Sequence, residues 1–199
     1  LIPFVKGIGI SGSLSKHGAT PESDIDFFLI TEKNRLWLVK AFAIALKKIL
    51  FLGSHKYLCV NYLLATDELP LKKKNRFQAM EAVTIIPLYG PEVFKLFLDA
   101  NKWIGDYFPN VFPPDFADLK STKNVFSSIC EFFLLGNLGF KLEQIAMNEF
   151  KKHGIIKYGK KGSKEGKFKY AKGESAYFPR DFESEVLKNY ELKTNTLAR

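Results

Sequence analysis

Ile8 to Thr31 read IGISGSLSKHGATPESDIDFFLIT, and this stretch decides the fold of the chain. It predicts a strand, a Gly-Ser turn, a polar loop and a second strand that opens with Asp24 and Asp26. Residues two apart on a strand point to the same face, so the two carboxylates lie side by side at the mouth of an otherwise apolar strand. Their repulsion is costly unless a cation sits between them, and Mg²⁺ binds a few carboxylates together with waters and phosphates. The stretch therefore predicts a Mg²⁺ site at the start of the second strand.

The turn before the loop has the features of a phosphate-binding site. Gly12 and Ser13 follow the first strand, where a glycine backbone can approach a phosphate and the N–H groups and the hydroxyl can bind it. Residues 7–12 also match the dinucleotide pattern G-x-G-x-x-G, but that fingerprint requires a helix to begin at the glycines. Residues 14–21 have no helical period and contain Gly and Pro, so we favour a phosphate-binding turn.

The spacing of these residues resembles a known family. Gly12-Ser13, ten intervening residues and then Asp24-Ile25-Asp26 are similar to the signature of the DNA polymerase β-like nucleotidyltransferase superfamily. The resemblance implies transfer of a nucleoside monophosphate from an NTP, such as ATP, to an unknown acceptor, with release of pyrophosphate. The acceptor could be a small molecule, an RNA or a protein. Catalysis in such a site rests mainly on positioning and on charge neutralisation.

The resemblance also implies a role for each residue of the motif. Asp24 and Asp26 would be catalytic and would hold Mg²⁺ on the triphosphate. Gly12 and Ser13 would bind the β- and γ-phosphates of the NTP. Lys16 is a further nucleotide-binding candidate because of its position in the loop.

The third strand departs from the family pattern. After a helix over residues 33–52, the sequence predicts a strand over residues 57–65, where active members usually carry a third acidic residue. Here the strongly polar residue is Asn61, which we count with the catalytic residues as the occupant of that place. An amide ligates a metal weakly and cannot act as a carboxylate general base. Two alternatives stay open: a strand-end asparagine bound to backbone, and a catalytically impaired nucleotide-binding or interaction module.

Composition describes a globular chain with anionic partners. The 199 residues are 46% hydrophobic and 15% aromatic, and the net charge of +9 favours nucleotides, RNA or acidic surfaces. No run of eighteen uninterrupted apolar residues is present, so we expect no membrane span. Cys59 and Cys130 both lie in apolar runs, which is typical of buried free thiols in a reducing cytosol, and we expect a cytoplasmic protein.

The C-terminal part contains two further features. Residues 123–152 predict a long helix whose section 129–140 is apolar nearly all round, so this section is buried in the chain or against a second copy, as in a homodimer. Residues 158–173 form a basic segment with interleaved aromatic residues, which could bind single-stranded nucleic acid or form a solvated loop. Its lysines are Lys160, Lys161, Lys164, Lys167, Lys169 and Lys172.

The sequence as a whole predicts an α+β fold. We expect a nucleotidyltransferase-like mixed β-sheet with flanking helices over residues 1–110, followed by a helical C-terminal region with a basic loop over residues 111–199. The boundary is placed at the break from Pro109 to Pro114. Within the first part we also predict a helix over residues 77–86, a turn over residues 88–91 and a helix over residues 92–107.

Overall fold

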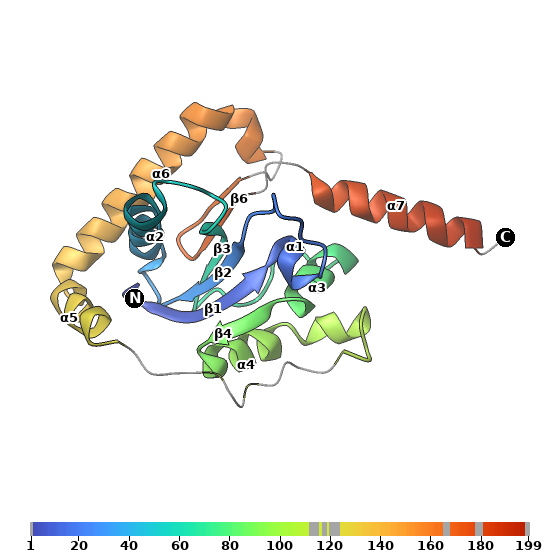
Figure 1. Ribbon diagram of the computed structural model, residues 1–199, viewed down its shortest axis with the longest axis horizontal. Helices are drawn as coiled ribbons and strands as arrows, with labels where there is room; N and C mark the ends of the chain where they lie inside the picture. The colour runs from blue at the N-terminus through green and yellow to red at the C-terminus, as the bar shows by residue number, and fades with distance from the viewer. Residues whose placement is uncertain are drawn as a thin grey trace.

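The computed structural model describes residues 2–111, 116, 119, 124–164, 168–177 and 181–197. Its centre is a mixed six-stranded sheet with the strand order β4-β1-β2-β3-β6-β5 and helices on both faces (Figure 1). The α+β fold class predicted from the sequence is confirmed. The C-terminal region, however, is not wholly helical, because it supplies the two strands β5 and β6 at one edge of the sheet.

The first half of the sheet has the element order that the sequence predicts. The order is β1 (Val5–Ser11), the short helix α1 (Gly12–Ser15), β2 (Asp26–Thr31), α2 (Leu36–Phe51) and β3 (Cys59–Ala65). Strands β1 and β2 are antiparallel, whereas β2 and β3 are parallel and are connected through α2. Parallel neighbours need such a crossover. Because β1 and β2 are antiparallel, the end of β1 lies beside the start of β2, where Ser11 is opposite Asp26.

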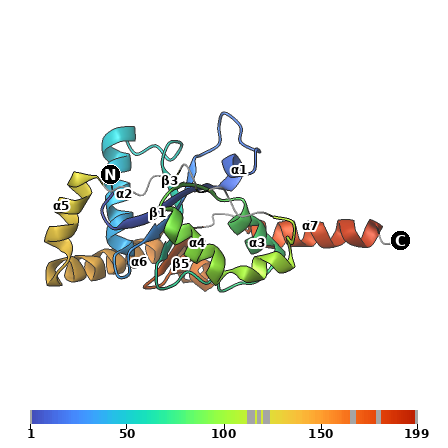
Figure 2. The same ribbon diagram turned by 90° about the horizontal axis from the view of Figure 1, so that it is seen from below.

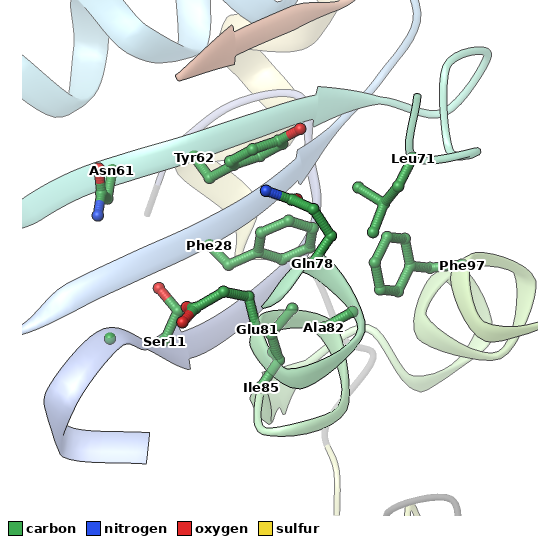
Figure 3. Close-up of a pocket in the computed structure, with 11 residues that line it drawn as sticks. Ser11, Phe28, Asn61, Tyr62, Leu71, Gln78, Glu81, Ala82, Ile85 and Phe97 are labelled. Atoms are coloured by element: carbon green, nitrogen blue, oxygen red, sulfur yellow. The ribbon is translucent and has the colours of Figure 1, made fainter. Parts of the chain in front are cut away.

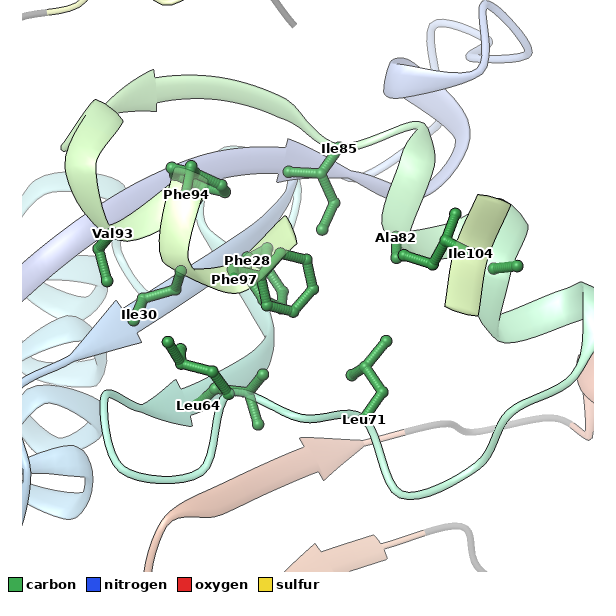
Figure 4. Close-up of a cluster of buried hydrophobic side chains, with 12 residues drawn as sticks. Phe28, Ile30, Leu64, Leu71, Ala82, Ile85, Val93, Phe94, Phe97 and Ile104 are labelled. Carbon is green, nitrogen blue, oxygen red and sulfur yellow. The ribbon is translucent and has the colours of Figure 1, made fainter. Parts of the chain in front are cut away.

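Two hydrophobic clusters fill the two faces of the sheet because strand residues alternate in direction. Phe28 and Ile30 pack with α4 (Pro91–Ala100) and with α3 (Arg76–Val83), as Figure 4 shows for this face. Leu29 and Leu63 belong to the opposite cluster, which contains residues of α2 and is covered by α6 (Asn137–Lys164). The helices of the C-terminal region thus complete the core on one face.

Three of the predicted elements after β3 differ in the structure. Helix α3 ends at Val83, and the expected turn is strand β4 (Ile86–Tyr89), which pairs antiparallel with β1. Pro87 removes a backbone donor, but β4 lies at the edge of the sheet, where a proline is tolerated. The single helix predicted over residues 92–107 is divided into α4 and the 3₁₀ helix η1 (Lys102–Asp106).

The long C-terminal helix of the sequence prediction is two helices joined by a sharp bend. Helix α5 (Val125–Leu134) and helix α6 meet at an angle of 93°. Gly139 allows this bend because a Cβ there would collide with the carbonyl group of Leu134. Helix α6 continues beyond the predicted end at residue 152 and reaches Lys164.

The basic segment is ordered rather than a loop where the structure describes it. Residues 158–164 belong to α6, and Phe168–Tyr170 form β5, which pairs antiparallel with β6 (Glu174–Tyr177). Strand β6 in turn pairs with β3, so this hairpin extends the sheet. Helix α7 (Phe182–Leu197) then projects from the body at the end opposite to α5 (Figure 2). Residues 112–114 of the predicted break over residues 109–114 lie outside the described residues, and the domain boundary there stays a prediction.

No single helix of the described chain has the length and apolar character needed to span a membrane. The bent pair of Val125–Leu134 and Asn137–Ile156 does meet the same requirements when the two helices are taken together, on length and composition only. 

Candidate functional site

The paired carboxylates lie where β2 begins. In the sheet, Asp26 is opposite Ser11 of β1 on one side and Cys59 of β3 on the other. The backbone of Ile25 already pairs with the β3 side: its N–H donates to the Lys56 carbonyl at 2.9 Å, and its carbonyl accepts from the Cys59 N–H at 3.1 Å. This extended pairing places the exposed Asp24 and the half-buried Asp26 on the same face, as the sequence predicts.

Burial and the neighbouring charges disfavour ionisation of Asp26. Burial raises the pKa of Asp26, and the Asp24 carboxylate raises it further. Hydrogen bonding to Cys59 and the charge of Lys16 oppose this effect but do not reverse it. Burial and the Asp26 carboxylate raise the pKa of Cys59 to about 12, so this side chain is a neutral thiol beside the carboxylate. A cation next to Asp26 would relieve the electrostatic cost.

The turn at Gly12 lies directly against Asp26. Gly12 has a positive φ of 70°, and a Cβ at this position would collide with the Asp26 carboxylate. Only glycine therefore allows the turn and the carboxylate to lie this close. Ser13 is half-buried in the same turn, and its carbonyl accepts the Gly18 N–H at 2.9 Å. The structure thus brings the two halves of the predicted motif together.

Lys16 is fixed next to the turn by two contacts. Its Nζ donates to the Gly12 carbonyl at 3.1 Å and to Glu81 Oε2 at 2.9 Å. Glu81 is on α3, and Figure 3 shows its side chain extending towards Ser11. Sequence reasoning missed Glu81, since it lies 65 residues from Lys16 and helix periodicity does not reveal which strand a helix packs against.

A small pocket of about 60 Å³ lies beside the turn, between the sheet and α3 (Figure 3). Its volume holds a few water molecules but no nucleotide base. The wall is mainly apolar, and its polar side chains are those of Ser11, Asn61, Tyr62, Gln78 and Glu81. An NTP would therefore lie over the mouth of this pocket rather than inside it.

Asn61 lines this pocket but is not the β3 residue opposite Asp26. The register shifts between Phe27 and Phe28, which pair with Val60 and Tyr62, so Asn61 is the extra residue of an irregularity in β3. Cys59 occupies the position next to Asp26 instead. Among the described residues, no group of three or more His, Cys, Asp or Glu side chains is arranged to hold a metal ion. The third-carboxylate role of Asn61 stays a prediction.

The basic segment contributes one clear contact near this face of the sheet. Lys169 Nζ lies 2.6 Å from Glu174 Oε1 and 3.2 Å from the Tyr62 hydroxyl, so this lysine is already paired. Lys172 is exposed. The side chains of the other predicted nucleic-acid contacts lie outside the described part of the chain; these are Lys160, Lys161, Lys164 and Lys167.

Comparison with known proteins agrees with this geometry. Residues 1–84 match the family model described as nucleotidyltransferase domain. The matched segment begins before β1 and ends with α3, so it includes Gly12, both aspartates and Glu81. This part of the chain is similar to nucleotidyltransferase domains, and the predicted resemblance to the DNA polymerase β-like superfamily is confirmed. No curated protein and no solved structure matches the chain.

Proposed function

We propose that the chain binds a Mg–NTP at the edge formed by Gly12, Ser13 and the two aspartates, and transfers its nucleoside monophosphate to an acceptor. The observation that carries this proposal is the contact between the Gly12 turn and the Asp26 carboxylate within the matched domain. A turn that would bind phosphate and carboxylates that would hold Mg²⁺ have to be adjacent, because Mg²⁺ takes its ligands from a few carboxylates and the substrate phosphates together.

The donor groups present fit one Mg²⁺ ion. Asp24 and Asp26 supply two carboxylates on one face, and the raised pKa of Asp26 marks the place where a cation would be favourable. Two carboxylates with waters and phosphate oxygens are the ligands that Mg²⁺ prefers, and the ion supplies charge neutralisation of the triphosphate. A second ion would be held weakly, since two negative charges balance one divalent ion and not two.

Two further residues, Lys16 and Glu81, would position the phosphates and accept a proton. Lys16 presents its ammonium group at the Gly12 turn, where it would face the phosphates, and Glu81 holds that group in place. Glu81 is also the carboxylate that lines the pocket, so we assign it as the candidate proton acceptor for the incoming hydroxyl group. Asn61, another polar residue of the pocket, cannot take a proton from the acceptor at neutral pH.

Calorimetric titration with each of the four NTPs tests the proposal, in Mg²⁺ and in EDTA. We expect binding in Mg²⁺ that is lost in EDTA and lost in the Asp24→Asn/Asp26→Asn variant. Lys33→Gln is a matched control because Lys33 is an exposed residue paired with Asp67 and lies outside the site. Absence of nucleotide binding by the folded wild-type protein would reject the proposal.

A second candidate function is a nucleotide-binding or interaction module with an impaired active site. The neutral thiol of Cys59 opposite Asp26 favours it, since an active member of the family usually has a carboxylate on this strand. This candidate predicts Mg–NTP binding without pyrophosphate release.

The variants Asn61→Asp and Cys59→Asp distinguish the two positions on β3. If either place is that of the missing carboxylate, its variant should raise pyrophosphate release by at least tenfold over the wild type, because a second metal ion is then held. If pyrophosphate release rises in Cys59→Asp but not in Asn61→Asp, the missing carboxylate belongs at position 59. If release rises in neither variant, the explanation by a missing carboxylate on β3 is contradicted.

A further inference from the structure

Helix α5 exposes its apolar side, whereas an ordinary surface helix buries that side. Its polar side faces the protein: Ser127 is buried, and Glu131 Oε1 accepts the backbone N–H of Phe4 at 2.7 Å. Its apolar side faces outwards and leaves 52% to 76% of each large side chain exposed. These residues are Val125, Phe126, Ile129, Phe132 and Phe133. A stable monomer normally buries the apolar side of a helix instead.

The same inversion continues into the first turns of α6. Glu143 is 2% exposed and accepts the backbone N–H groups of Trp37 at 3.0 Å and Leu38 at 2.8 Å. Exposed apolar residues continue along this surface, namely Leu135 at the bend and Leu138 and Phe140 of α6. Between Asn124 and Ile145 the chain contains three charged residues, and Lys141 is the exposed one. We call the outward surface of residues 124–145 the elbow face.

The elbow face is attached to the core by polar contacts. Arg35 Nη2 donates to the carbonyl of Leu134 at 3.1 Å and to that of Leu135 at 3.0 Å, so the bend is attached to the start of α2. With the Glu131 and Glu143 contacts, three separate polar anchors hold the elbow to the core. A preformed surface of this kind can bind a partner with little loss of conformational freedom.

The size of the elbow face matches one side of a standard protein interface. Eight large side chains that are each 47% to 76% exposed present together on the order of 800 Å² of apolar surface. This is the area that each partner contributes to a stable complex, and it exceeds the apolar patches of ordinary monomers. Interfaces between identical subunits are the more apolar class, which agrees with the single exposed charge of this surface.

We propose that the elbow face is a dimer interface on which α5 packs against α5 of a second copy of this chain. A two-fold arrangement pairs the surface with itself and needs no complementary charge. A lipid surface is the weaker occupant, since helices that lie in a membrane interface carry Lys or Arg beside their apolar side, and α5 contains neither. The elbow lies at the end of the molecule away from α1 and α3, so dimerisation leaves the candidate site open (Figures 1 and 2).

Sedimentation velocity over a series of protein concentrations tests the proposal. We expect the wild type to dimerise and Phe132→Ser/Phe133→Ser to raise the dissociation constant at least 100-fold. The matched control is Ile49→Ser/Leu50→Ser, which removes two exposed apolar residues of α2, and its constant should stay within twofold of the wild type. Circular dichroism verifies folding, and Phe132→Gln with an expected tenfold or larger effect replaces the double variant if that variant unfolds.

Measurements with added salt and with lipid vesicles distinguish a second copy of the chain from a lipid surface as the partner of the elbow face. Because each copy carries a net charge of +9, added salt should strengthen the dimer by screening repulsion. A wild type that stays monomeric at high concentration, or a dimer that the elbow variants do not weaken, overturns the proposal. So does flotation of a monomeric wild type with phosphatidylcholine–phosphatidylglycerol vesicles that is lost in the same variants, since the occupant is then a lipid surface.

Discussion

The candidate site and the elbow use carboxylates in opposite ways. Glu131 and Glu143 are turned inwards, and they accept backbone N–H groups from Phe4, just before β1, and from α2. Asp24 and Asp26 lie at an open edge, repel each other and have a neutral thiol as a neighbour. Burial raises the pKa of Glu143 as well as that of Asp26, so burial alone does not separate the two regions. The comparison teaches that a carboxylate bound to backbone donors fixes structure, whereas one placed beside a second carboxylate is available to a cation.

The largest expected effect tests the open carboxylates. Asp26→Asn should weaken Mg–NTP binding at least 100-fold in calorimetry, because the half-buried metal ligand is lost. The same change should leave the free energy of unfolding unchanged or slightly higher, since ionised Asp26 is destabilising in the folded protein. A loss of stability comparable to the loss of binding would show that Asp26 is a structural carboxylate like those of the elbow.

The inward carboxylates should behave in the reverse way. Glu143→Ala removes the acceptor of two backbone N–H groups, and leaving such buried donors unpaired should cost about 2–4 kcal/mol of unfolding free energy. Denaturation in urea measures this loss. Nucleotide affinity of the folded variant should remain within twofold of the wild type, and a selective loss of affinity would contradict the division between the two regions.

The smallest effect concerns a cation on the same side of the sheet as the elbow. Lys40 Nζ donates to Ser175 Oγ at 2.8 Å and lies 5.2 Å from the Trp37 ring centroid, with two further aromatic rings nearby. Burial lowers its pKa from 10.5 to about 8. Between pH 8 and pH 10.5 the unfolded chain therefore binds more protons than the folded protein. The contribution of Lys40 to the free energy of unfolding is fully present above pH 10.5 and is lost as pH falls through 8.

The measurement compares the wild type with Lys40→Met, in which this titration is absent. From pH 7 to pH 10 the wild type should gain about 1–3 kcal/mol of unfolding free energy relative to the variant, because the ring faces attract the ammonium group and offset part of the burial cost. A difference that is flat with pH would show that the rings offset the whole cost of burying Lys40.

The sequence predicts local features well and long-range contacts poorly. The three central strands and the facing of Asp24 and Asp26 follow from apolar runs and a period of two. Residue counting cannot reveal the irregularity that moves Asn61 away from the position opposite Asp26. The apolar residues of the elbow are visible in the sequence, but their outward orientation depends on the Glu131 and Glu143 contacts with a part of the chain about a hundred residues away.

Strand β4 and the β5–β6 hairpin were missed for a related reason. Each strand has three or four residues, which is too short for a periodic pattern, and Pro87 favours a turn. Their place is set by an available neighbour in the sheet, β1 for β4 and β3 for β6. Sequence patterns describe one segment at a time and carry no information about such neighbours.

The strand order has a consequence for any shortened form of the protein. The segment that matches the family contains β1, β2 and β3, while both strands that flank them, β4 and β6, come from later in the chain. A fragment of residues 1–84 would therefore expose unpaired backbone groups along both sides of a three-stranded sheet, which is the template for strand-to-strand aggregation. We expect residues 1–84 to aggregate when β4 and β6 do not cover the two sides of the sheet.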